Sequence, residues 1–172
     1  NRRGEFASGL FVVAPGLTVK ERLQVLRPGN PANVYDEFHL CPSEALRQKL
    51  NRAELVIDNW HTLMPAKDAP RSVVKKGPES DRAFVRRVLG PLAQHRRIAV
   101  INDEAHHAYR EPPEGRERQQ ARRAARELGV DAEEATRWIE GLDRIHRKAC
   151  ILRCFALTAT PFAPTGKTHT EQ

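Results

Sequence analysis

Short apolar runs alternate along the chain with longer segments in which apolar residues recur at helical spacing. The runs have the length of buried strands, and polar or turn-forming residues follow each of them. We expect strands over residues 10–14, 54–59, 97–102 and 152–158. Helical spacing and capping residues predict helices over 18–26, 43–52, 81–94, 116–128 and 131–148. This alternation favours an α/β fold with a mainly parallel sheet flanked by helices.

Two of these helices carry more specific signals. Thr18 and Glu21 have the spacing of a capping box, which predicts that the first helix starts there. The helix over 131–148 has an apolar stripe that we expect to pack into the core rather than to bind a cofactor. The stripe consists of Ala135, Trp138, Ile139, Leu142 and Ile145.

The most informative string is IAVINDEAHH. The apolar run 98–101 leads through Asn102 to two adjacent carboxylates, Asp103 and Glu104. In an open parallel sheet, ligands bind beyond the carboxyl ends of the strands. The order therefore matches a Walker B arrangement, in which one carboxylate holds Mg²⁺ and its neighbour orients or deprotonates the attacking water. A strand that simply ends in a polar turn is the structural alternative.

Three other strings share this form. LFVVAPGLTVKERL, over 10–23, indicates a strand, a Pro-Gly turn and a helix. LVIDNWHTL, over 55–63, and CFALTATPF, over 154–162, are apolar runs that end in polar residues. Residues 103–106 spell the DEAH box of superfamily 2 helicases, and Thr158-Ala159-Thr160 resembles their Ser/Thr-Ala-Thr motif. In order and spacing the four strings resemble the first motor domain of the helicase subunit of type III restriction enzymes and its DEAD/DEAH relatives.

This resemblance implies ATP hydrolysis with Mg²⁺, coupled to movement on duplex DNA. Asp103 would hold Mg²⁺, with Glu104 beside it as the base or water-orienting group. His106 would relay the nucleotide state to Thr158 and Thr160. The DNA path would be lined by residues that contact phosphates without regard to sequence. They are Pro15, Gly16, Thr18, Asn59 and His61.

Two positions depart from the relatives. The relatives commonly have Asn-Tyr-His where this chain has Asn59-Trp60-His61. An aromatic ring is kept at this position, and whether it stacks on a base is left open. They also often have Thr before that Asn, whereas this chain has Asp58. Because a carboxylate facing DNA would repel phosphate, either Asp58 points elsewhere or this site does not grip the strand.

The resemblance covers roughly residues 9–163, which we expect to form part of a RecA-like (P-loop NTPase) domain. Residues 1–8 would be a disordered segment and 164–172 a flexible tail. No phosphate loop of the form G-x-x-x-x-G-K-[ST] precedes residue 10, and Gly166-Lys167-Thr168 lacks the glycine that this loop needs at Pro161. We therefore expect a fragment that is inactive alone. The resemblance implies that its parent has a second motor domain and a nuclease domain, and works with a methyltransferase or specificity subunit.

Composition adds limits to these expectations. A length of 172 residues indicates one domain, and no apolar run approaches a membrane span. Three cysteines without paired spacing favour a reducing, cytoplasmic location. The net charge of +7 favours a polyanionic partner. Much of the excess lies at 82–97 and 116–126, and the second cluster is best explained as a solvated helix face.

Two other classes of function stay open at this point. One is a nucleic-acid-binding module without catalysis, and the other is an interaction or structural remnant of a helicase gene. Flanking coding sequence with a phosphate loop, a second motor domain and a nuclease would separate both from the motor.

Overall fold

The computed structural model describes residues 6–64, 79–105, 119, 123, 132–149 and 151–158. All four predicted strands are present, with ends shifted by at most two residues. The strands are β1 (Gly9–Ala14), β2 (Glu54–Asn59), β3 (Ile98–Asn102) and β4 (Ile151–Ala156). The α-helices are α1 (Leu17–Arg22), α2 (Val34–Glu37), α3 (Glu44–Asn51), α4 (Asp81–Leu89) and α6 (Ala132–Ala149). Short 3₁₀ turns are η2 (Leu23–Leu26), η3 (Trp60–Leu63) and η4 (Gly90–Gln94).

Some predicted segments fall outside the described residues. They are residues 1–5, the tail 164–172 and the expected helix 116–128, of which only Gln119 and Arg123 are described. Ser8, in the segment expected to be disordered, donates backbone and side-chain hydrogen bonds to the Arg97 carbonyl at 2.8 and 2.9 Å. None of the described helices is both long and apolar enough to cross a membrane.

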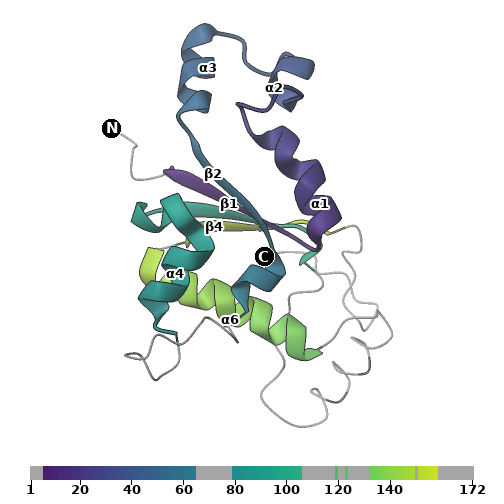
Figure 1. Cartoon of the computed structure of the whole chain (residues 1–172), viewed down its shortest axis with the longest axis vertical. Coiled ribbons are helices and arrows are strands. Elements are labelled where there is room, and N and C mark those ends of the chain that lie inside the picture. Colours follow the sequence, from purple (N-terminus) through teal and green to yellow (C-terminus); the bar gives the residue numbers. More distant parts are fainter. Residues whose placement is uncertain are drawn as a thin grey trace, which may run out of the picture.

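The four strands form one parallel sheet in the order β2-β1-β3-β4 (Figure 1). The register places Val13 of β1 opposite Asp58 of β2 and Asn102 of β3. Asn102 in turn lies opposite Ala156 of β4. Parallel strands require long crossover connections, which the helices supply. The predicted α/β fold with a parallel sheet flanked by helices is confirmed.

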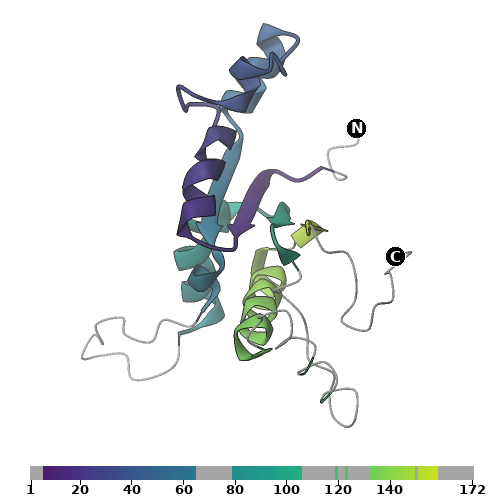
Figure 2. The same ribbon diagram turned by 90° about the vertical axis from the view of Figure 1, so that its right-hand side faces the viewer.

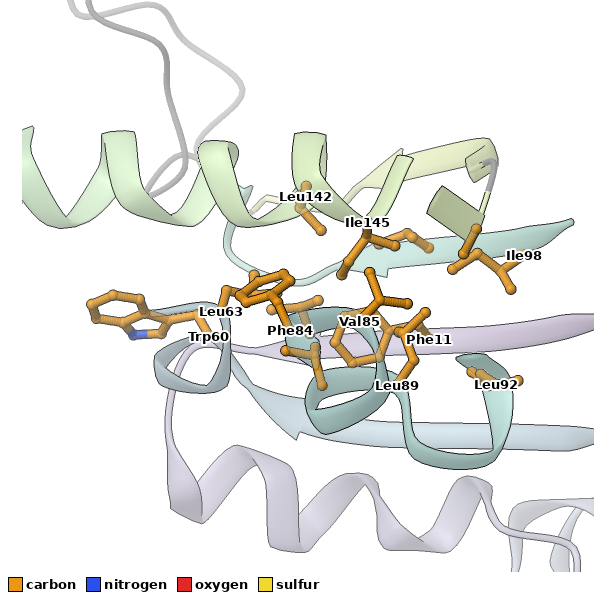
Figure 3. Close-up of a cluster of buried hydrophobic side chains, with 14 of the residues drawn as sticks. Phe11, Trp60, Leu63, Phe84, Val85, Leu89, Leu92, Ile98, Leu142 and Ile145 are labelled. Atoms are coloured by element: carbon orange, nitrogen blue, oxygen red, sulfur yellow. The ribbon is translucent and has the colours of Figure 1, made fainter. Parts of the chain in front are cut away.

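The main core lies between one face of the sheet and the helices α4 and α6 (Figure 3). The sheet contributes alternate residues, as expected when side chains point to opposite faces in turn. These are Phe11, Val13, Ile98 and Val100. The predicted stripe of α6 is buried against them, except that Ile139 is only half-buried.

The other face of the sheet is covered more sparsely. Val12, Ala14 and Ile57 point to this side and are buried, and α1 packs against β1 and β2. Helices α2 and α3 lie at the end of the molecule away from α6 and bury none of their own residues (Figures 1 and 2). On the edge strand β4 and directly after it, the side chains of Phe155 and Leu157 are exposed.

Two helices begin or end at other residues than the sequence predicts. The capping box at Thr18 and Glu21 is wrong: α1 begins at Leu17, and extended Gly16 is its N-cap without a side-chain cap. The helix predicted over 81–94 ends at Leu89, because Gly90 has φ 50° and proline follows it. By contrast, the helix predicted over 43–52 is present as α3, and its N-cap Ser43 accepts a hydrogen bond from the Leu46 N–H.

Helices α4 and α6 are joined by a charged contact at the rim of the core. Arg144 Nε of α6 donates to Asp81 Oδ1 at 2.8 Å, and its guanidinium lies 4.0 Å from the Phe84 ring centroid. The hydrogen bond from Arg144 is the main reason that the pKa of the Asp81 carboxyl is lowered from its ordinary value. The contact holds α6 in place over the core.

Gly141 provides a test of the contact between α6 and η3. A Cβ atom at this position would lie 2.7 Å from Leu63 Cβ and 3.0 Å from the Leu63 carbonyl oxygen. Within a helix, Ala is ordinarily better than Gly by about 1 kcal/mol. At position 141 we expect the opposite: Gly141→Ala should destabilise the protein. Overpacking should lower the free energy of unfolding by about 1–3 kcal/mol. Urea unfolding followed by circular dichroism measures the change.

Gly29→Ala is the matched control, because no atom lies within 4 Å of its added Cβ. Its effect should stay within about 0.5 kcal/mol, as for most surface substitutions. Equal stability of the two variants would show that η3 does not approach α6 this closely.

Candidate functional site

The polar residues singled out in the sequence gather at the carboxyl edge of the sheet. Asp103 and Glu104 follow β3, the Pro15-Gly16 turn follows β1, and Asn59 ends β2. Thr158 lies two residues beyond the end of β4. Because all four strands are parallel, these ends lie along one edge. His106 and Thr160 are outside the described residues.

Backbone hydrogen bonds join the loop after β3 to the strands on both sides. The Asp103 N–H donates to the Val13 carbonyl of β1 at 3.0 Å. On the other side, the Leu157 N–H donates to the Asn102 carbonyl and the Ala105 N–H donates back to the Leu157 carbonyl, each at 2.9 Å. The carboxylate loop is therefore fixed to the residue immediately before Thr158.

The Asp103-Glu104 pair has an unusual backbone. Asp103 Oδ1 accepts a hydrogen bond from the Glu104 N–H at 3.0 Å, and Glu104 has φ 50°. A glutamate rarely adopts this left-handed region, which costs free energy that the surrounding structure must offset. Such outliers concentrate at functional sites, so the observed strain favours a role for this turn beyond ending a strand.

Asn102, the last residue of β3, is a buried polar group that the sequence analysis left without a role. Its side chain is 4% exposed, and among the described residues no group hydrogen-bonds to its Oδ1 atom. A buried acceptor without a partner is costly, since it gives up its bonds to water. Its signal in the sequence was a polar residue closing an otherwise apolar strand.

The ligand chemistry of this edge suits a hard cation. Asp103, Glu104 and Asn102 offer carboxylate and amide oxygens, the ligand type that Mg²⁺ takes in proteins. Within the described part of the chain no three histidine, cysteine or acidic residues form a metal cluster. Mg²⁺ at nucleotide sites usually has one or two carboxylates with water and phosphate oxygens as its other ligands. The described ranges contain no glycine-rich phosphate loop.

Asp58 forms an ion pair with Lys20, a partner that the spacing of the sequence did not predict. Its Oδ1 atom accepts hydrogen bonds from Lys20 Nζ of α1 at 2.6 Å and from the Asn59 N–H at 2.8 Å. Both side chains of the ion pair are partly exposed. The Asp58 carboxylate is therefore directed to α1, one of the two alternatives that the sequence left open. Only the fold brings residues 20 and 58 together.

In the string Asn59-Trp60-His61, the Trp60 ring is buried in the core and the His61 ring lies at the surface. Trp60 is 7% exposed and stacks on Trp138 of α6, with ring centroids 5.5 Å apart and an angle of 5° between the planes. The core therefore occupies the Trp60 indole, which answers the question of base stacking that the sequence left open at this position. His61 is exposed. Thr18 is exposed on α1, while Pro15 and Gly16 are half-buried.

Comparison of the chain with protein-family models, with curated proteins and with solved structures finds no match. Three features distinguish the carboxyl edge of this chain. They are the strained acidic turn, the buried Asn102 oxygen without a partner among the described residues, and the link to the segment before Thr158.

The Lys20–Asp58 pair predicts an effect on polyanion binding. Asp58→Asn removes the counter-charge of Lys20, while the amide oxygen can still accept the Asn59 N–H. We expect affinity for DNA to rise a few-fold at low salt. The plot of log affinity against log salt should become steeper by up to about 0.9, the value for one added phosphate contact. Fluorescence anisotropy across a salt series measures both quantities.

Glu37→Gln is the control for net charge, since Glu37 lies on α2 at the far end of the molecule. If it raises affinity as much as Asp58→Asn does, only the overall charge matters and Lys20 does not face the nucleic acid.

Proposed function

We propose that the chain forms part of the first, RecA-like motor domain of an ATP-dependent DNA helicase or translocase of the restriction type. The observation that carries the proposal is the junction at the carboxyl edge. There the Asp103-Glu104 turn is hydrogen-bonded, through Ala105, to the residue before Thr158. In this proposal the end of β3 binds the nucleotide, and the end of β4 bears the Thr158 hydroxyl. Coupling between hydrolysis and movement requires contact between two such sites, and the backbone hydrogen bond supplies it.

In this proposal the chain's own residues act on the cation and on water. Asp103 would hold Mg²⁺, directly or through water, and the cation would neutralise charge on the phosphates. Glu104 lies at the next position, where it orients the attacking water and accepts its proton. Bound ATP supplies the phosphoryl group, and positioning and charge stabilisation account for most of the catalysis of its transfer.

Coupling to the nucleic acid follows from the same junction. A shift of the Asp103-Glu104 turn on nucleotide binding would pull on Ala105 and hence on the segment with Thr158. A single hydrogen bond is worth about 1 kcal/mol, which is comparable to the lower end of typical coupling free energies of about 1–3 kcal/mol. The net charge of +7 favours the polyanionic track on which such a motor would move.

Hydrolysis tests the proposal directly. In the full-length motor protein proposed to contain this chain, Glu104→Gln should retain Mg·ATP binding and lower DNA-stimulated turnover by about 10²–10⁴-fold, the usual contribution of a general base. Asp103→Asn should in addition weaken Mg²⁺ binding. Phosphate release measures turnover, and Glu37→Gln on α2 controls for loss of one negative charge.

Turnover equal to wild type in both variants would exclude the Walker B role of these carboxylates. DNA binding without any hydrolysis in the wild-type protein would instead favour a non-catalytic nucleic-acid-binding module.

Thr158 gives a separate test of coupling. Thr158→Val keeps the shape of the side chain and removes the hydroxyl, whereas Thr158→Ser keeps the hydroxyl. We expect Thr158→Val to leave ATP turnover within about two-fold of wild type, because the residue adjoins the turn without supplying a ligand, and to reduce triplex displacement per ATP about 5-fold or more. Thr158→Ser should behave as wild type. An unchanged ratio of displacement to turnover in Thr158→Val would reduce this threonine to an ordinary strand end.

A further inference from the structure

The exposed imidazole of His61 lies on a buried aromatic support. Its ring stacks on the indole of Trp60, with the centroids 4.0 Å apart and an angle of 29° between the planes. Trp60 itself is buried, whereas His61 is exposed. One aromatic ring of the turn η3 is therefore held in the core, and the ring stacked on it is presented to solvent.

The support continues into α6. Trp60 stacks almost parallel on Trp138, which is 2% exposed and fixed in the main core. Figure 3 shows Trp60 at one end of the buried cluster, beside Leu63. The imidazole is therefore stacked on an indole that is itself packed against a buried core residue.

The backbone on both sides of His61 is held as well. Thr62 Oγ1 donates to the Asn59 carbonyl at 2.9 Å. Arg87 of α4 donates to the Thr62 carbonyl at 2.8 Å and to the Met64 carbonyl at 2.9 Å. Arg87 is itself held by Glu79 through a hydrogen bond of 2.9 Å. Because the turn is ordered before any ligand arrives, binding there loses little conformational entropy.

The surroundings favour an aromatic ligand over a bare phosphate. Lys20, the cation that α1 brings to this end of β2, is already paired with Asp58. A phosphate contact would need only an N–H at the edge of the imidazole and no stacked support. Exposed aromatic side chains, histidine among them, are the groups on which unpaired nucleobases stack in proteins that bind single strands.

We propose that His61 is a stacking platform for an unpaired nucleobase. The ligand at this end of the carboxyl edge is then a single-stranded segment held through its bases, not a duplex held only through phosphates. That the ligand is a nucleic acid rests on the proposed function. The inference adds that this nucleic acid is single-stranded and that His61 contacts its bases. It replaces the expected phosphate contact at His61.

The test compares a short fluorescent oligothymidylate with a strand of the same length made of abasic sites, which has the phosphates without the bases. The chain as it stands is titrated into each and followed by anisotropy at low salt. Wild type should prefer the oligothymidylate. His61→Ala should lower affinity for it by about 5- to 150-fold, the usual range for loss of one base–aromatic stack, and should bind the abasic strand unchanged.

His61→Phe separates stacking from charge and hydrogen bonding, since it keeps an aromatic face and has neither. It should retain the base preference, whereas His61→Lys, with charge but no ring, should lose it. His39→Asn is the matched control: His39 is also exposed but lies beyond α2, and Asn tolerates its φ of 50°. It should match wild type on both strands.

Two results would overturn the platform: equal binding of wild type to both strands, or a His61→Phe variant that behaves as His61→Ala. Absence of binding to either strand would overturn it as well. Failure of the motor proposal is distinguishable, because it appears as wild-type ATP turnover in Glu104→Gln and leaves the base preference of this chain intact.

Discussion

Parallel hydrogen bonding among four strands is the constraint on which the rest of this structure depends. A parallel pair cannot be closed by a tight turn, so each strand must be followed by a crossover that returns the chain to the amino edge. The crossovers supply α4 and α6 on one face and α1 on the other. The same constraint gathers the four carboxyl ends at one edge, which is where ligands bind in open sheets of this kind. Backbone pairing alone brings side chains that are distant in sequence to the same edge of the sheet. Asn59, Asp103 and Thr158 are examples.

Two of the free-energy costs of the structure lie at this edge. Glu104 adopts a left-handed backbone, and Asn102 has a buried oxygen without a partner in the described structure. Burial of Phe11, Val100 and the α6 stripe behind the edge offsets these costs. Within that stripe, Trp138 Nε1 is a further buried polar atom without a hydrogen-bond partner among the described residues. A rigid core that supports a strained polar rim is typical of proteins whose function lies at the ends of strands.

Much of the sheet could be predicted from the sequence, because buried parallel strands are short apolar runs and each run here is bounded by polar residues. The apolar stripe of α6 could also be predicted, since the spacing of its residues matches the helical period. The capping box at Thr18 failed because extended Gly16 starts the helix two residues earlier. Helix α2, of four residues, is too short to show any period. The ion pair of Lys20 with Asp58 and the burial of Trp60 depend on which strands become neighbours, and local spacing does not encode that.

The central claim is that the carboxyl edge binds a divalent cation through the turn after β3. Paramagnetic broadening of amide resonances by Mn²⁺, a substitute for Mg²⁺, tests it on the chain itself. The account predicts that signals of Asp103, Glu104 and Thr158 broaden first, while those of Gly9 and Ile151 at the opposite edge stay sharp. It also predicts that Asp103→Asn abolishes the selective broadening. Broadening centred on other residues, or an unchanged pattern in Asp103→Asn, would contradict the account.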